Sequence, residues 1–405
     1  MQPTPLPGQE RLESIDVLRG FALFGIISVN TLFFAQPAAI ATTLGYAGQP
    51  DALSHFLVAF LAQSKFYGLF SFLFGLGFAI QMERWESRGP GRFRRRLLVL
   101  LGFGLLHGLL VWMGDILSIY ALAGMALPWF RNAKPRTLII WAICLLGLGT
   151  LAFAAMGGLV WLGQMFAPAE MARTTAGMRE QVTKEAAKAI QAYGSGPYAA
   201  LFAFRARELA QAYGMGLAVL PHIFTMFLLG LWAWKRGVFQ HLESSARLRQ
   251  RMLWLGLLLG LPLNFLAAWM SRGGMVGSLH GALLGVAVTL IAAPLLTFGY
   301  IALLLRLLES PRWRRFIEPL HWSGRMALTN YLTQSLVMTT VFYFFGLGLY
   351  GKLHLHWSLL IALSVALAQV PLSRWWLSKR AMGPAEWLWR RLTYGRFSTA
   401  EKAHL

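Results

Sequence analysis

The chain has 405 residues, of which 57% are hydrophobic and only 13% are charged, and its formal net charge is +21. A soluble domain carries about twice this fraction of charged residues, so the composition excludes an ordinary soluble fold. Apolar runs longer than the roughly 18 residues that suggest a membrane helix recur along the chain, without the alternation of barrel strands. Because a backbone in lipid must satisfy its own hydrogen bonds, the sequence predicts an all-α integral membrane protein.

The apolar runs predict about ten transmembrane helices. As one helix, the run 97–130 would be about 51 Å long against a hydrocarbon core of about 30 Å, so we expect it to turn at Met113-Gly114-Asp115. The predicted spans lie near 15–36, 56–82, 97–113, 115–130, 137–166, 214–234, 252–270, 278–308, 326–347 and 357–378.

The predicted spans divide the chain into three parts. Residues 15–166 form an N-terminal group of helices, and residues 214–395 form a C-terminal helical region. Between them, 167–213 is predicted to be an extracytoplasmic loop that contains an amphipathic helix and breaks at Gly194-Ser195-Gly196-Pro197. The sequence therefore predicts a single polytopic domain with one sizeable water-exposed insert.

The basic residues are distributed unevenly. If odd-numbered spans run outward, the inner segments together with Arg19 hold 26 of the 37 Lys and Arg residues, and the outer segments hold eight. Because short cytoplasmic loops carry excess Lys and Arg, this pattern predicts that both termini are cytoplasmic. It also explains the net charge by topology and contact with the lipid bilayer, so nucleic acid is not an expected partner.

His107 and Asp115 lie in the apolar stretch HGLLVWMGDILSIY. If Gly114 is near the outer turn, His107 lies roughly 10 Å below it, within the hydrocarbon, where a histidine has to face protein or a water-filled cavity. Asp115 could orient the imidazole, which is the arrangement of a general base held by a carboxylate. The alternatives are a helix-linking hydrogen bond for His107 and an N-cap for Asp115.

Asp16 and Arg19 share a helix face at the cytoplasmic end of the first predicted span. Their spacing favours an anchoring ion pair, and an arginine there could also receive a phosphate-bearing donor. Asn30 lies close to the same face, about 16 Å higher, where it could donate a hydrogen bond to a carbonyl or link helices.

Three further polar residues fall inside predicted spans. Lys65 is expected to extend its ammonium group toward the interface, although an intramembrane lysine could also bind substrate. Asn330 and Gln334 are spaced i, i+4 and favour contacts between helices over a substrate site. The sequence contains no spacing typical of metal ligands, so we expect no metal and no tightly bound cofactor.

Five stretches carry a family resemblance. They are DVLRGFALFGI followed by Asn30, KFYGLFSFLFGLG, HGLLVWMGDILSIYALAG, GRMALTNYLTQS and GPAEWLWRRLT. In this order and over most of the chain, they resemble the YeiB family of bacterial membrane proteins, whose C-terminal part is the domain of unknown function 418. The resemblance implies location in the inner (cytoplasmic) membrane with a cytoplasmic N-terminus.

A wider similarity links this family to transmembrane acyltransferases, such as the lysosomal heparan glucosaminide acetyltransferase. It implies transfer of an acyl group from cytoplasmic acyl-CoA to an acceptor on the far side. The matching residues are Asp16, Arg19 and Gly20, followed by Asn30. In the heparan enzyme the catalytic histidine follows its asparagine closely, whereas the first histidine after Asn30 is His55. A catalytic role of His107 is therefore our inference and does not come from the resemblance.

Three functional hypotheses remain at this point. In an acyltransferase, His107 oriented by Asp115 would be the base, Arg19 would contact the phosphates of acyl-CoA and Asn30 would stabilise the oxyanion. In a proton-coupled transporter, His107, Asp115 and Lys65 would form a proton relay. In a scaffold, these polar residues would only pack helices. The resemblance favours the acyltransferase, with a sugar or envelope component as acceptor.

Overall fold

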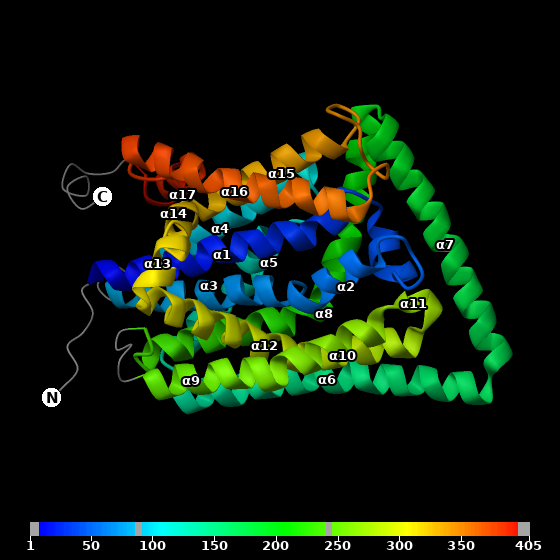
Figure 1. Ribbon diagram of the computed structural model, residues 1–405, viewed down its shortest axis with the longest axis horizontal. Coiled ribbons are helices and arrows are strands. Elements are labelled where there is room, and N and C mark those ends of the chain that lie inside the picture. The colour runs from blue at the N-terminus through cyan, green and yellow to red at the C-terminus, as the bar shows by residue number, and fades with distance from the viewer. Residues whose placement is uncertain (1–7, 86–90, 240–244, 396–405) are drawn as a thin grey trace.

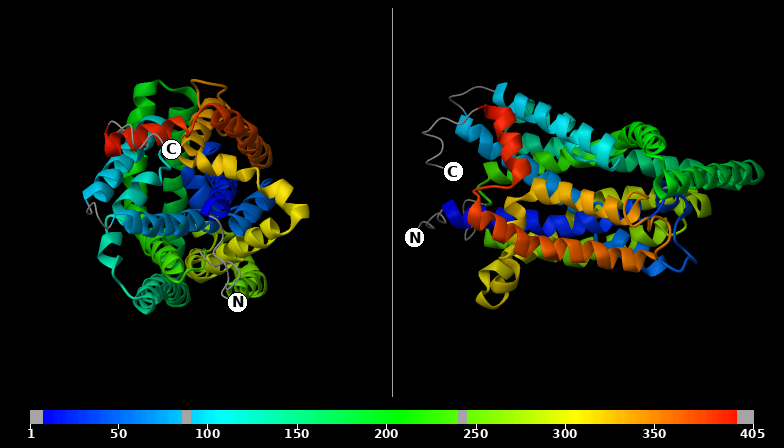
Figure 2. Two further views of the ribbon diagram at one scale, coloured as in Figure 1. Left: turned by 90° about the vertical axis from the view of Figure 1, so that its left-hand side faces the viewer. Right: turned by 90° about the horizontal axis from the view of Figure 1, so that it is seen from above.

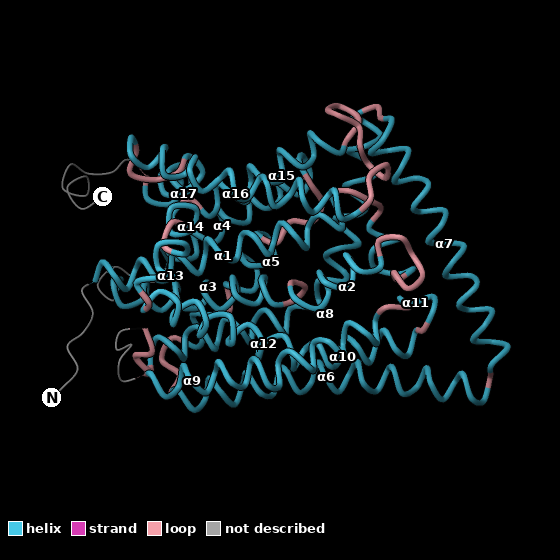
Figure 3. The backbone as a smooth tube through the Cα atoms, viewed as in Figure 1, coloured by secondary structure: helices cyan, strands magenta, loops and turns pink. Residues whose placement is uncertain are grey.

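The computed structural model describes residues 8–85, 91–239 and 245–395. Helices joined by short loops make up this part of the chain, which contains no β-strand (Figure 3). The all-α prediction is therefore confirmed. The helices lie roughly parallel in an elongated bundle, and the first turn of α1 and the helix α17 lie at the same end (Figure 1).

Seven helical stretches of the described residues are long and apolar enough to cross a membrane, which indicates a multi-pass membrane protein. Two of them are interrupted: α2 is followed by α3 after a three-residue break, and α9 continues into α10 through a π-helical turn at Gly256–Gly260. The helices that form these stretches are α1 Gly8–Phe34, α2 Ala52–Leu61 with α3 Lys65–Trp85, α6 Pro135–Phe166, α8 Tyr198–Lys235, α9 Ala246–Leu255 with α10 Leu261–Ser271, α12 Leu279–Glu309 and α16 Leu355–Lys379.

The other three predicted spans form shorter helices. The run 97–130 turns back as predicted, because α4 (Gly91–Leu106) ends in a π-helical turn at His107–Val111 and α5 (Leu117–Gly124) begins after an extended Trp112. The span predicted near 326–347 becomes α15 (Ala327–Phe342). The remaining short elements are Ile40–Leu44, Leu127–Phe130, α11 Gly274–Gly277, α13 Pro311–Ile317 and α14 Leu320–Arg325.

Helix α1 occupies the interior of the bundle (Figure 2, left) and packs against α3, α14, α15 and α16. The most extensive helix pair is α3 with α8. Two glycines allow this approach: a methyl group at Gly75 would collide with the carbonyl oxygen of Phe227, and one at Gly230 would collide with that of Phe72. Helix α6 is the most lipid-exposed of the long helices, since few of its side chains are buried.

The insert predicted at 167–213 consists of two helical segments. Helix α7 (Pro168–Ser195) crosses one end of the bundle obliquely (Figure 1), and the chain breaks at Gly196-Pro197 as expected. Helix α8 then begins at Tyr198, which is 16 residues before the predicted start at 214. The sequence did not predict this early start of α8, because the first part of the helix carries charged residues and lacks the continuous apolar run of a membrane span.

At the other end of the bundle, α17 (Pro384–Tyr394) packs on α4 and α15. The Trp389 indole donates a 3.0 Å hydrogen bond to the Arg96 carbonyl, and the Arg96 guanidinium lies 3.9 Å from the centre of the same ring. Glu386 accepts hydrogen bonds from the backbone N–H groups of Leu328 (2.7 Å) and Thr329 (3.1 Å), which are among the free donors of the first turn of α15.

Candidate functional site

His107 begins the π-helical turn that ends α4. Its Nδ1 atom lies 3.0 Å from Oδ1 of Asp115, and both side chains are almost completely buried. The turn closes with a 2.9 Å hydrogen bond from the Trp112 N–H to the His107 carbonyl. Single π-helical turns within α-helices are often found at functional sites. The two residues that the sequence singled out therefore meet in one buried pair.

The second carboxylate oxygen of Asp115 is also occupied. Oδ2 accepts hydrogen bonds from the Ser118 backbone N–H (2.8 Å) and from Ser118 Oγ (2.6 Å). Asp115 therefore caps the first turn of α5 and holds His107 at the same time, so the two roles considered for it coexist. The Ser118 hydroxyl in turn accepts a 2.9 Å hydrogen bond from Tyr213 of α8.

The other imidazole nitrogen, Nε2 of His107, is buried and has no hydrogen-bond partner among the described residues. An ionised carboxylate can only accept, so the proton of a neutral imidazole is assigned to Nδ1, and Nε2 presents a lone pair. The rings of Tyr331 and Trp112 lie 5.2 Å and 6.3 Å from the imidazole centre. This arrangement is that of an oriented base in apolar surroundings, with one nitrogen free to accept a proton.

One face of α8 covers this pair. Arg205 Nη1 donates a 3.2 Å hydrogen bond to the Leu109 carbonyl, and a methyl group at Gly108 would lie 3.1 Å from the Leu209 side chain. With Tyr213 these residues are spaced i, i+4 and i+8. The sequence interpretation missed them because they fall in the insert predicted as a loop, although their spacing of four was a usable helical signal.

The sequence is similar to known proteins over nearly the whole chain, including the helices described above. Residues 233–396 match the family model described as "Protein of unknown function (DUF418)". The chain is 36% identical over 415 residues to the "Uncharacterized protein YxaH" of Bacillus subtilis, covering 97% of this chain and 96% of the relative. It is 30% identical over 397 residues to the "Uncharacterized protein YeiB" of Escherichia coli, covering 95% and 96%. The chain belongs to the YeiB-like DUF418 family. No solved structure matches it.

In this YeiB-like chain, His107 and Asp115 lie outside the stretch matched by the DUF418 model. Asn330 and Gln334 lie inside it. The relatives nevertheless align over nearly the whole chain, so the helices that carry His107 and Asp115 belong to the shared part of the YeiB-like proteins.

Asp16 and Arg19 form a partly buried ion pair of 2.8 Å in the N-terminal half of α1. Near the other end of α1, Phe34 stacks on Trp112 with ring centres 4.1 Å apart. The 15 residues from Arg19 to Phe34 correspond to about 22 Å of helix. The ion pair, in the N-terminal half of α1, is therefore well separated from His107, which lies near the C-terminal end of this helix.

Asn30 lies one helical turn before Phe34, on the side of α1 nearer the ion pair. Its side chain is half-buried and forms no hydrogen bond with any other residue that the structure describes. Its amide is therefore available to a ligand, as the oxyanion hypothesis requires.

Lys65 does not extend toward the interface, so that expectation is wrong. Its side chain is 1% exposed and its ammonium group donates a 2.8 Å hydrogen bond to the Ala59 carbonyl in the last turn of α2. His222 of α8 lies nearby and is fully buried. Thr297 of α12 donates to the Lys65 carbonyl. The structure thus brings Lys65 to His222 and not to His107.

Asn330 and Gln334 join α15 to its neighbours. Asn330 Nδ2 donates to the Ser323 carbonyl (3.1 Å) and to Ser373 Oγ (3.0 Å), and Gln334 Nε2 donates to Gln369 Oε1 (2.8 Å). These contacts match the interhelical role considered from the sequence. They also occupy donor atoms that a substrate would need.

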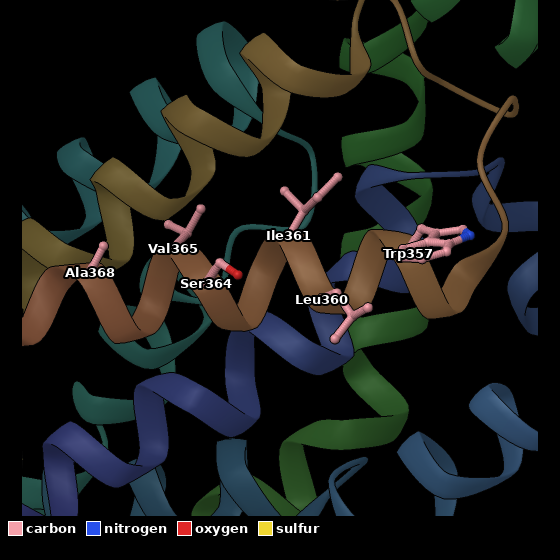
Figure 4. Close-up of a pocket in the computed structure, with 6 residues that line it drawn as sticks. All are labelled: Trp357, Leu360, Ile361, Ser364, Val365 and Ala368. Atoms are coloured by element: carbon pink, nitrogen blue, oxygen red, sulfur yellow. The ribbon is translucent and has the colours of Figure 1, made fainter.

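A shallow groove of about 480 Å³ runs along the outer surface of α16 (Figure 4). It is lined by Trp357, Leu360, Ile361, Ser364, Val365 and Ala368. None of the residues proposed for the site faces it, and its apolar lining suits the acyl chains of the surrounding lipid. Over the described residues, no group of three or more His, Cys, Asp or Glu side chains is arranged to hold a metal ion.

Proposed function

We propose that the protein is a membrane acyltransferase that moves an acyl group from cytoplasmic acyl-CoA to an extracytoplasmic acceptor. The observation that carries this proposal is the free Nε2 atom of a histidine whose Nδ1 atom is held by Asp115. A neutral imidazole in this state is a general base, and such bases contribute about 10²- to 10⁴-fold to a rate.

In the proposed reaction, Nε2 of His107 takes the proton of an acceptor hydroxyl. The acceptor oxygen forms a bond to the thioester carbonyl carbon, and Asn30 donates a hydrogen bond to the developing oxyanion. The carbon–sulfur bond then breaks, and the CoA thiolate leaves and takes up the proton. Acyl-CoA is a substrate here, and no resident cofactor is needed.

The proposal uses ten crossings of the inner membrane with both termini in the cytoplasm. The uneven distribution of Lys and Arg supports this orientation, and the placement of the start of α1 and of α17 at one end of the bundle supports an even number of crossings (Figure 1). Arg19 then faces the cytoplasm, where its guanidinium group can bind a phosphate of the donor. An acceptor of the sugar or envelope class would approach from the opposite end.

A second candidate function, a proton-coupled transporter, is favoured by the buried pair of Lys65 and His222. Ionisable groups in the membrane interior often mark proton or ion pathways. Reconstituted vesicles with an internal pH dye separate the two functions, because a transporter moves protons without acyl-CoA and an acyltransferase does not.

The test of the proposed function uses the full chain in nanodiscs with a fluorescent acyl-CoA. We expect binding and slow thioester cleavage by the wild type, binding without cleavage by His107→Ala, and loss of binding by Arg19→Ala. The control is His354→Ala. His354 also contacts an aspartate, Asp51, but it is exposed and is not part of the proposed site. Folded wild-type protein that binds no acyl-CoA would overturn the proposal.

A further inference from the structure

Arg205 of α8 is a guanidinium group sealed inside the protein with most of its donors unused. The residue is 0% exposed, and within the described parts of the chain its side chain forms one hydrogen bond, from Nη1 to the Leu109 carbonyl. Nε and Nη2 are buried and have no partner among the residues that the structure describes. A buried cation with unmet donors is costly, so this state is incomplete unless an anion binds there.

The nearest acid on α8 does not complete Arg205. Glu208 lies one turn further along the helix, and its Oε2 accepts a 2.5 Å hydrogen bond from the Tyr193 hydroxyl. The positive charge of Arg205 lowers the pKa of Glu208, but the two groups form no ion pair in the described structure. Burial raises the pKa of Glu208 to about 7, so near neutral pH this carboxyl is only partly ionised and leaves the arginine charge partly uncompensated.

Arg205 lies against the candidate catalytic turn. Leu109, whose carbonyl it contacts, is in the same π-helical turn as His107. Trp112 follows this turn, and its indole N–H is another buried donor without a partner in the described residues. Three polar groups in or beside residues 107–112 therefore lack hydrogen-bond partners among the described residues. Two are donors, the Arg205 guanidinium and the Trp112 indole, and one is an acceptor, Nε2 of His107.

We propose that Arg205 binds an oxyanion, a phosphate or a carboxylate, carried by the acceptor, so that the acceptor of the YeiB-like protein is an anionic molecule. The planar fork of free N–H groups formed by Nε and Nη2 matches two oxygens of either group. An acceptor held there has its reacting hydroxyl near the turn that carries His107. The identity of the acceptor rests on the proposed function, but the anion site does not.

The cover over Arg205 belongs to the segment between α15 and α16. The Tyr343 ring lies 5.9 Å from the Arg205 guanidinium carbon, and Phe344 N–H donates a 2.9 Å hydrogen bond to the Tyr193 carbonyl at the end of α7. An acceptor reaches the arginine when this segment separates from α7. Few polar contacts oppose that movement, because aromatic packing dominates the interface between Tyr193, Tyr343 and Tyr350.

The test is the thermal unfolding midpoint of the full chain in an uncharged maltoside detergent, titrated with sodium phosphate or sodium acetate against sodium chloride of equal ionic strength. A ligand that binds only the folded state raises the midpoint with its concentration. We expect a saturable rise with phosphate or acetate for the wild type and for Arg207→Gln, whose exposed guanidinium pairs with Glu185. We expect no rise for Arg205→Gln and at least tenfold weaker binding for Arg205→Lys.

Short-chain phosphatidylglycerol and glycerol phosphate, compared at equal concentration, show whether the phosphate comes from a lipid headgroup or from a water-soluble molecule. No rise beyond that of chloride in the wild type overturns the anion site, and so does an equal rise in Arg205→Gln. If Arg205→Gln does not fold, the titrations of the wild type and of Arg205→Lys still show whether Arg205 binds an anion. Acyl-CoA cleavage that depends on His107 is measured separately, so either proposal can fail alone.

Discussion

The hydroxyl group of Tyr213 donates a 2.9 Å hydrogen bond to Ser118, which in turn donates a 2.6 Å hydrogen bond to the carboxylate that holds His107. A residue of the long helix α8 is thus linked through one serine to Asp115. This chain of hydrogen bonds limits the movement of the carboxylate and, through it, of the imidazole ring.

Replacing Tyr213 with Phe removes the hydroxyl group and keeps the ring. A neutral hydrogen bond contributes about 0.5–1.5 kcal/mol, so we expect acyl-CoA cleavage to slow by roughly 2- to 10-fold. The matched control is Tyr198→Phe. Tyr198 donates a similar 2.9 Å hydrogen bond to the Leu110 carbonyl, in the π-helical turn His107–Val111, and forms no hydrogen bond with Asp115 or Ser118. Equal rates in both variants would show that the Tyr213 hydroxyl does not help to position the base.

Asp115→Asn tests the orientation of His107. An amide at this position can still accept the Ser118 N–H bond, but it cannot hold Nδ1–H of the imidazole with a full negative charge. We expect cleavage to fall by about 10²- to 10⁴-fold, the usual contribution of a general base, while the unfolding midpoint changes much less. Both are measured on one preparation, and a large loss of stability without a change in rate per folded molecule would contradict the assignment.

Lys65→Met removes a buried ammonium group and keeps the length of the side chain. Because the Ala59 carbonyl is its only hydrogen-bond partner among the described residues, we expect the free energy of unfolding to rise by about 1 kcal/mol or more. Lys352→Met, at an exposed lysine, should change it by less than about 0.5 kcal/mol. Denaturant unfolding in mixed micelles measures both, and destabilisation by Lys65→Met would contradict the prediction.

Gly75→Ala should be strongly destabilising, because the new methyl group would meet the backbone carbonyl of Phe227 and force α3 and α8 apart. Overpacking of this kind costs about 1–3 kcal/mol or more. Gly147→Ala in α6 is the control, since nothing lies within 4 Å of the added atom and alanine favours a helix by about 1 kcal/mol. The unfolding midpoint should therefore shift in opposite directions in the two variants.

Glu208 predicts a pH dependence of stability. Its pKa in the folded protein is about 7, above the ordinary value of 4.5, because burial disfavours the ionised carboxyl. The folded state therefore binds more protons than the unfolded state between these values, and the free energy of unfolding falls as the pH rises from 4.5 to 7, by an amount on the order of 3 kcal/mol. Glu208→Gln should remove this decline.

Glu185→Gln is the matched control for the pH experiment. The pKa of Glu185 is lowered, first by its hydrogen bond from Lys188, so its contribution to stability is lost as the pH falls and has the opposite sign. Thermal unfolding of the three proteins between pH 4 and 8 distinguishes these effects. A Glu208→Gln protein with the same pH profile as the wild type would contradict the prediction.

The sequence predicted the helical class and the turn between α4 and α5 because both follow from length and periodicity. Met113-Gly114-Asp115 could end a helix, and the run was too long for one crossing. A pair of His107 and Asp115 was one of the two interpretations that the sequence allowed, because only eight residues separate them and a tight turn brings both to one place.

The contacts made by α8 and by Lys65 could not be predicted in this way. Periodicity shows which residues of a helix share a face, but not which other helix that face meets. Arg205 and Tyr213 contact residues more than 90 positions away in sequence, and the burial of Lys65 depends on α8 and α12 lying against it. Long-range packing therefore decides the part of the candidate site that the sequence missed.

Glu386 makes the start of α15 dependent on a segment that is synthesised later. The ribosome makes α15 before α17, yet the first N–H groups of α15 are bonded by a carboxylate 57 residues later in the chain. During biosynthesis these donors therefore lack the carboxylate until α17 has emerged and packed against α15. Any truncation before Glu386 leaves α15 in its unfinished nascent state, so reporter and affinity tags belong after Tyr394.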